Sequence, residues 1–465
     1  MRLTLPGHVV SRLGVGLAQG IALSLLYQAV QQKIWPATNG NVFALLVTVA
    51  FFVPTLVISG LGNLRPRTLI VWGAVATAIC AGLAYYDILR DPVTLFGVPQ
   101  MPRIVPTATM WFSLSAILFI VHTLTVAGDA DRRVIATYPT HFDVSWKHGV
   151  QFVLAMCFVA VLWALLFLGG ELFRLIRIEF FATLIRKQTF YIPVTALAFA
   201  CALHVTDVRA SIVQGTRTLL LVLLSWLLPL MALIAAGFVV ALAFTGLAPL
   251  WGTRWAARIL LIAAAALIFL INAAHQDGRV DDRTAAVLRY AKVLAAIAIV
   301  ALTALAAIAL YLRVAQYGWT PDRIIATACV VVAAFYAAGY IYAAARAGAA
   351  MKPLESTNVM TALVIVGVLL MLRSPVLDPA RISVADQVHR LEAGIVTPDH
   401  FDFAFLRYRA GRFGPDELER LAARPEGPQA AAIAERANQA RRANTPYETA
   451  HPLPPVSAEM RARNI

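Results

Sequence analysis

The chain contains eleven long runs of apolar residues separated by short polar segments, and these runs constrain its fold more than any other feature. A helix needs about 20 apolar residues to cross a hydrocarbon core of about 30 Å. The runs are continuous rather than alternating, and no water inside a bilayer can satisfy an open backbone, so they predict helices rather than barrel strands. The predicted spans are residues 13–30, 42–59, 68–86, 108–126, 152–168, 190–205, 219–244, 257–273, 290–312, 324–345 and 360–372.

The predicted fold class is an all-α, polytopic transmembrane helical bundle of about eleven spans, followed by a small helical soluble module. With 60% hydrophobic and only 14% charged residues, the composition differs from that of soluble domains, which carry about 25% charged residues. We predict a transmembrane domain at residues 1–372, a helical extramembrane module at 373–423 and a disordered tail at 424–465. The last span is the shortest, so the number of spans stays open by one.

Short helices are predicted beyond Arg373. Ser383 and Asp386 have the spacing of a capping box, which predicts the start of a first helix. Two further helices are predicted after Pro398 and Gly414. A module of this size buries little apolar surface by itself, so we expect it to pack against membrane loops or a protein partner. Residues 424–465 lack apolar periodicity, which predicts disorder.

The segment between the fifth and sixth predicted spans contains both charged and apolar residues. Residues 171–188 combine Leu, Phe and Ile with several charged side chains, which is typical of an interfacial helix. Prolines at positions 54 and 229 lie inside predicted spans and are expected to kink them, which either lines a cavity or serves packing.

The net charge is +14, and almost all of this excess lies before Arg373. Basic residues at helix ends favour anionic lipid headgroups, so the charge predicts a bilayer partner and no nucleic acid. Fifteen Lys and Arg residues fall in the loops on the N-terminal side and eleven on the other. This count favours a cytoplasmic N-terminus and, with eleven spans, a periplasmic tail. The first apolar run has no obvious small-residue cleavage site and more spans follow it, so we predict an uncleaved first helix.

The main candidate site is a polar cluster at the end of the sixth span. His204 and Asp207 are three residues apart, on one face of a helix, and Arg209 follows closely. Ionisable groups within a membrane are costly and usually turn inward and pair, so a functional ion or proton site is one interpretation. The alternative is a helix end whose three side chains lie among the lipid headgroups.

Four residues are weaker candidates. His141 and Asp143, with His148 further on, are expected in a loop beside a span, and His275 and Asp277 are expected in another loop. Neither group offers the fixed shell of three or four ligands that a metal requires, so we predict no metal and no cofactor. No phosphate-binding Gly-rich loop, HExxH pair or GxSxG elbow occurs, so no catalytic residue is predicted.

Several loop sequences form distinctive runs, namely HVTDVR, NAAHQDG and QYGWTPDR, together with residues 127–147 and 383–405. These runs resemble those of a bacterial family of polytopic inner-membrane proteins catalogued as domain of unknown function four-one-five-three. The resemblance extends to about Leu421. It implies a multi-spanning protein of the bacterial inner membrane, and it implies neither an activity nor any functional residue.

Three functions remain open from the sequence. A membrane scaffold or sensor would present the helical tail module to an envelope partner. A transporter or channel for a small solute or ion would use the proline-interrupted spans, although no internal repeat supports it. A membrane-embedded enzyme acting on an envelope lipid would use the His and Asp residues near the span ends.

Overall fold

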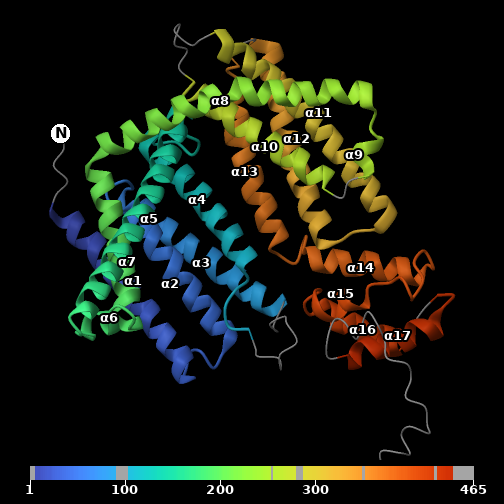
Figure 1. Cartoon of the computed structure of the whole chain (residues 1–465), viewed down its shortest axis with the longest axis horizontal. Helices are drawn as coiled ribbons and strands as arrows, with labels where there is room; N and C mark the ends of the chain where they lie inside the picture. The colour runs from blue at the N-terminus through green and yellow to red at the C-terminus, as the bar shows by residue number, and fades with distance from the viewer. Residues whose placement is uncertain are drawn as a thin grey trace, which may run out of the picture. The chain divides into compact units, whose positions relative to one another are not determined.

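The computed structural model describes residues 6–90, 103–252, 255–278, 286–347, 351–423 and 427–443. The residues in these ranges form helices and no strands (Figure 1). Among these described residues, eleven helices are long and apolar enough to cross a membrane, and each contains one predicted span, which confirms a multi-pass membrane protein. They are α1 (Pro6–Gln32), α2 (Gly40–Gly60), α3 (Pro66–Arg90), α4 (Ala108–Asp131), α5 (Tyr138–Leu175), α7 (Gln188–Val208), α8 (Ala210–Thr245), α10 (Ala256–His275), α11 (Ala286–Tyr317), α12 (Pro321–Ala347) and α13 (Leu354–Leu372).

Helix α5 is longer than the predicted fifth span at both ends. It begins at Tyr138, so the expectation that His141 and Asp143 lie in a loop is wrong. The prediction of one interfacial helix across 171–188 also has the wrong bounds, because α5 continues to Leu175 and only the short α6 (Phe180–Leu184) follows. A second short helix, α9 (Ala248–Gly252), precedes α10.

Small residues bring α1 and α7 close together. Gly16 and Gly20, one turn apart on α1, face α7. A methyl group added at Gly16 would lie 2.5 Å from the Ala200 Cβ, and one at Gly20 would lie 2.4 Å from the Pro193 Cα. Close backbone approach of this kind is how helices associate in membranes, where apolar burial alone gives no preference for a partner helix.

The chain divides into two compact units, which we describe separately. The first comprises the described residues of Met1–Tyr85, Ile104–Tyr311 and Ala326–Leu370, and the second those of Tyr86–Arg103, Leu312–Ile325 and Met371–Ile465. The second unit therefore includes more than the predicted module, because two segments next to membrane helices pack with it. It contains α14 (Pro379–Glu392), α15 (Phe403–Tyr408), α16 (Phe413–Ala423) and α17 (Ala430–Arg442).

Helix α14 begins earlier than the capping-box pattern predicts. Its N-cap is Asp378, whose Oδ1 accepts the Ala380 N–H at 2.8 Å and whose Oδ2 accepts the Tyr86 hydroxyl at 2.8 Å. Ser383 and Asp386 instead lie inside the helix. Asp386 Oδ2 accepts the backbone N–H of Trp319 at 2.7 Å, and the Ser383 hydroxyl donates to the Trp319 carbonyl at 3.1 Å. The module thus packs against a loop between membrane helices, one of its two expected partners.

Helix α17 contradicts the prediction of disorder for part of residues 424–465. Ile433, Ala437 and Ala440 are buried against the apolar side chains of α14, α15 and α16. Their spacing of four and three residues places them on one helical face, but two of the three are alanines, so the apolar periodicity is weak. Residues 424–426 and 444–465 lie outside the described residues, and the prediction stays untested there.

Candidate functional site

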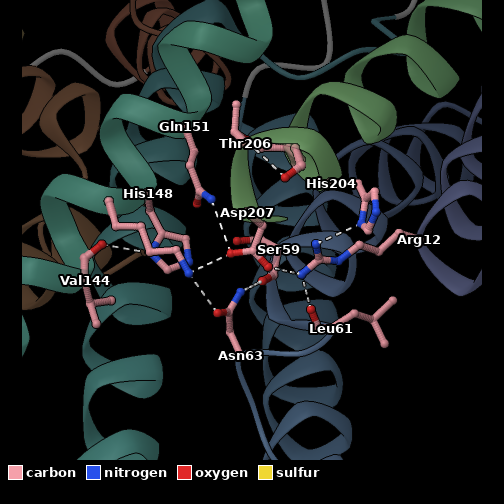
Figure 2. A network of polar contacts seen from close by, with 12 residues as sticks. Arg12, Ser59, Leu61, Asn63, Val144, His148, Gln151, His204, Thr206 and Asp207 are labelled. Carbon is pink, nitrogen blue, oxygen red and sulfur yellow. Dashed lines mark hydrogen bonds and ion pairs between the residues drawn. The ribbon is translucent and has the colours of Figure 1, made fainter. Parts of the chain in front are cut away.

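Asp207, near the end of α7, turns inward and binds two cations. Its Oδ2 lies 2.6 Å from Arg12 Nη2, and its Oδ1 lies 2.7 Å from Lys147 Nζ. Figure 2 shows the Asp207 carboxylate between Arg12 and Gln151, whose side-chain amide donates to Oδ1 at 3.4 Å. The Arg12 side chain is only 4% exposed and that of Asp207 13%. An inward, paired arrangement is what a low-dielectric environment demands of ionisable groups.

The two cations are held by further acceptors. Arg12 also donates to the Leu61 carbonyl, and its Nη1 lies 3.4 Å from His204 Nδ1. Lys147 Nζ donates to the Asn63 side chain at 3.0 Å. The network therefore joins α1, α5, α7 and the end of α2, with two positive charges for one negative charge.

The structure brings together two of the three residues of the predicted polar cluster. His204 and Asp207 both contact Arg12, as the helical spacing indicates. Arg209 is exposed and takes no part in the network. Arg12, Lys147 and Gln151 are additional members that the sequence analysis did not select. Each is an ionisable or amide side chain that comes just before the predicted first or fifth span, but nothing local in the sequence pairs it with Asp207.

A second polar group joins α2, α3 and α4 through Ser59, Trp72 and His122. The Trp72 indole N–H donates to His122 Nδ1 at 3.0 Å, and His122 Nε2 lies 3.0 Å from Ser59 Oγ. Indole can only donate, so we assign the hydrogen of the neutral His122 ring to Nε2. His122 consequently donates to Ser59 and is not placed to accept its proton. The pair does not form a serine nucleophile with its base.

His148 presents a free acceptor beside this group. Its Nδ1 lies 2.8 Å from the Val144 carbonyl, which can only accept, so in the neutral ring Nδ1 carries the hydrogen. The Nε2 lone pair is then available, and this buried atom has no hydrogen-bond partner among the described residues. The ring packs edge-on against His122, with ring centroids 5.2 Å apart.

Both groups border a partly open cavity of about 920 Å³ that is lined by residues of α1, α2, α4, α5 and α7. Most of its lining is apolar, and much of it is aromatic, including Phe52, Phe119 and Phe199. Ser59, His122, His148 and Gln151 also line it, and Gln151 is in addition a member of the Asp207 network. The cavity is therefore largely apolar, with polar groups that connect it to the buried ion pairs.

The weaker candidates do not join this site. Asp143 pairs with Arg217 at 2.6 Å, and His141 is buried with Nε2 lacking a partner among the described residues. His275 Nε2 lies 3.8 Å from Glu355 Oε1, and Asp277 lies just beyond the end of α10. Among the described residues, no group of three or more His, Cys, Asp or Glu side chains is arranged to hold a metal ion.

A further polar network was not predicted. Asn272 donates to the Tyr340 hydroxyl at 2.7 Å, Tyr340 donates to Asn358 at 2.7 Å, and Asn358 donates back to Asn272 at 2.5 Å. The three side chains thus form a closed ring of hydrogen bonds with one another. This network stabilises the packing of α10, α12 and α13 and does not offer a free group to a ligand.

No family model matches the chain, and neither the curated proteins nor the solved structures contain a match to it.

Proposed function

We propose that this chain is a multi-pass protein of the bacterial inner membrane whose membrane domain binds an amphipathic, lipid-like molecule. The supporting observation is the cavity of about 920 Å³, which combines a mainly apolar, aromatic lining with a polar group at Ser59, His122, His148 and Gln151. Its volume is within the range of about 300–1,000 Å³ common for small-molecule sites. A bilayer surrounds such a site with amphipathic molecules at high concentration.

The geometry of this site supports ligand binding better than it supports catalysis. In the assigned tautomer His122 donates to Ser59, and the Asp207 carboxylate is bound by two cations, so neither acts readily as a base. The His122–Ser59 pair and the Asp207 carboxylate instead hold their hydrogen bonds in fixed directions, which is what recognition of a ligand requires.

In this proposal the protein senses its ligand and presents the helical C-terminal module to an envelope partner. The module contacts the loop between α11 and α12 through Ser383 and Asp386, and this loop belongs to the same compact unit as the module. The bacterial inner-membrane location rests on the resemblance of the loop sequences, and a cytoplasmic N-terminus on the distribution of Lys and Arg.

Transport of the bound molecule is the second candidate. Pro54 in α2 and Pro193 in α7 interrupt two helices of the cavity wall, and each lies next to lining residues, Thr55 and Ile192. Proline removes a backbone hydrogen bond and allows a helix to bend. Movement of α2 against α7 would open the cavity.

A cavity-blocking substitution tests the proposal. Gly149 lines the cavity, and a Cβ at this position meets no atom within 4 Å, so Gly149→Trp projects into the empty space. Gly73 on α3 has the same open surroundings but does not line the cavity, which makes Gly73→Trp the matched control. We expect lipid that co-purifies with the wild type and with Gly73→Trp, measured by mass spectrometry, to be lost from Gly149→Trp.

Equal lipid content in all three proteins would contradict the proposal. Reconstitution separates sensing from transport: a transporter moves a fluorescent lipid between leaflets of proteoliposomes, and Gly149→Trp stops this movement, whereas a sensor binds the lipid without moving it.

A further inference from the structure

We infer that the ligand of this cavity is an uncharged lipid with a hydroxyl headgroup, such as a diacylglycerol, and that Ser59 and His148 bind the hydroxyl. This inference rests on the proposed function, because it specifies the molecule that the cavity takes. It follows from the charge of the lining and from the hydrogen-bonding capacity left open at its polar end.

The described residues that line the cavity include no Asp, Glu, Lys or Arg. Arg12 and Lys147 are not among the lining residues, and their charged ends lie against other groups: Arg12 Nη1 and Nη2 contact His204, Asp207 and Leu61, and Lys147 Nζ contacts Asp207 and Asn63. Taking an ionised headgroup out of water without a paired countercharge is strongly unfavourable. The lining therefore favours a neutral headgroup.

The hydroxyls around the cavity differ in whether their hydrogen is already used. Thr55 donates to the Phe51 carbonyl at 3.0 Å and Thr195 to the Tyr191 carbonyl at 2.6 Å. Ser59 accepts from His122, and among the described residues its own hydrogen has no acceptor. Ser59 thus retains a donor at the cavity surface.

His148 supplies the complementary acceptor. Its Nδ1–H is used by Val144, its Nε2 has no partner among the described residues, and the residue is only 7% exposed. Ser59 and His148 both contact the His122 ring, Ser59 through a hydrogen bond to Nε2 and His148 through an edge-on ring contact. A headgroup hydroxyl accepts from Ser59 and donates to His148, whereas a fully ionised phosphate or carboxylate has no hydrogen for Nε2 and repels its lone pair.

The experiment is a competition between two lipids that differ only in a phosphate. The purified full-length protein in nanodiscs is labelled with a diazirine-bearing diacylglycerol, and dioleoylglycerol or dioleoylphosphatidate is added as competitor. We expect dioleoylglycerol to displace the probe at a concentration at least ten-fold lower than dioleoylphosphatidate.

Two variants test the assigned residues. Ser59→Ala and His148→Phe each remove one of the two hydrogen bonds to the headgroup hydroxyl, and each is expected to weaken dioleoylglycerol competition by about five- to ten-fold, since 1.4 kcal/mol corresponds to ten-fold in affinity. Thr77→Ala is the control, because Thr77 lies on α3 outside the cavity and donates to its own helix at the Gly73 carbonyl. It is expected to compete as the wild type does.

Equal or better competition by dioleoylphosphatidate would overturn the inference, as would wild-type competition in both Ser59→Ala and His148→Phe. Failure of the proposed function gives a different result: labelling of the wild type would then be unaffected by Gly149→Trp, whichever competitor is present.

Discussion

Asp207 balances two cations that would otherwise be costly to bury. Arg12 is almost fully enclosed, with 4% of its side chain exposed, while Lys147 keeps 32% of its side chain exposed. Removing one partner of a buried ion pair costs about 3–5 kcal/mol, mainly because it leaves the other charge uncompensated. Arg12 depends on Asp207 more strongly than Lys147 does, since water reaches the lysine.

We therefore expect Asp207→Asn to destabilise the protein by about 3 kcal/mol, because the amide keeps the size of the side chain but not its charge. Thermal unfolding in detergent, followed by fluorescence, measures this effect. The exposed Arg209→Gln is the control and is expected to unfold as the wild type does. The double variant Arg12→Gln with Asp207→Asn should recover part of the loss. An Asp207→Asn protein as stable as the wild type would show that the ion pairs contribute nothing.

For single residues, the sequence predicts only relations between positions that are close together in the chain. His204 and Asp207 can be selected because their spacing places them on one helical face near a span end. The partners of Asp207 cannot, since Arg12 is 195 residues away in the chain and the pairing depends on which helices become neighbours. Arg209 does not join them, because α7 ends one residue before it and its side chain is exposed.

Among the elements, α1 depends on glycine for its contact with α7. Gly20→Val would place a branched side chain against the Pro193 backbone, 2.4 Å from its Cα, and neither helix can yield without separating. Overpacking of this kind costs about 1–3 kcal/mol or more. We expect lower expression and a lower unfolding temperature for Gly20→Val. Gly14→Val on the same helix meets nothing within 4 Å and should be tolerated; equal behaviour of the two variants would exclude a close α1–α7 contact.

Helix α17 belongs to the core of the second unit. Ile433 is fully buried and Ala432 beside it is exposed. Ile433→Glu is expected to destabilise the unit, because it buries an unpaired carboxylate, and to increase trypsin cleavage after Arg420 and Arg436. Ala432→Glu should leave the cleavage pattern unchanged. For the same reason, deletion of residues 424–465 is expected to destabilise the module. If Ile433→Glu changes neither stability nor cleavage, the prediction that this segment is disordered would be supported instead.

The elements themselves are largely predictable, and their ends are not. Each span follows from a long apolar run, which is a property of the local sequence. The start of α14 is different: Ser383 and Asp386 match a capping box, but they bind Trp319 of a distant loop, while Asp378 caps the helix. A Ser and an Asp three residues apart look the same in the sequence whether they cap a helix or bind a distant loop, so only the tertiary contacts distinguish the two roles.

For the whole molecule, the Asp207 network indicates how the helices alternate in direction. It joins the N-terminal parts of α1 and α5 to the C-terminal ends of α2 and α7. Helices that meet in this way run in opposite directions, so these four ends share one side of the membrane with the N-terminus. The Lys and Arg count favours the cytoplasm for that side.

We expect a cytoplasmic N-terminus and a periplasmic C-terminus. A fusion after Ile465 to alkaline phosphatase should be enzymatically active, and a fusion to green fluorescent protein should be dark. Fusions within the α4–α5 connection, on the side of the network, provide the control and should give the opposite result. A bright fluorescent fusion at the C-terminus together with an inactive phosphatase fusion would reverse the orientation.

The cavity among α1, α2, α4, α5 and α7 carries the central claim, and a density map of the protein in lipid nanodiscs tests it most directly. The lining residues come from five separate helices, so their association was not predictable from the sequence. We predict an elongated density within the cavity that ends in hydrogen-bonding contact with Ser59 and His148 and that is absent from Gly149→Trp. A wild-type cavity that is closed by its own side chains, or that contains only ordered water, would contradict the account.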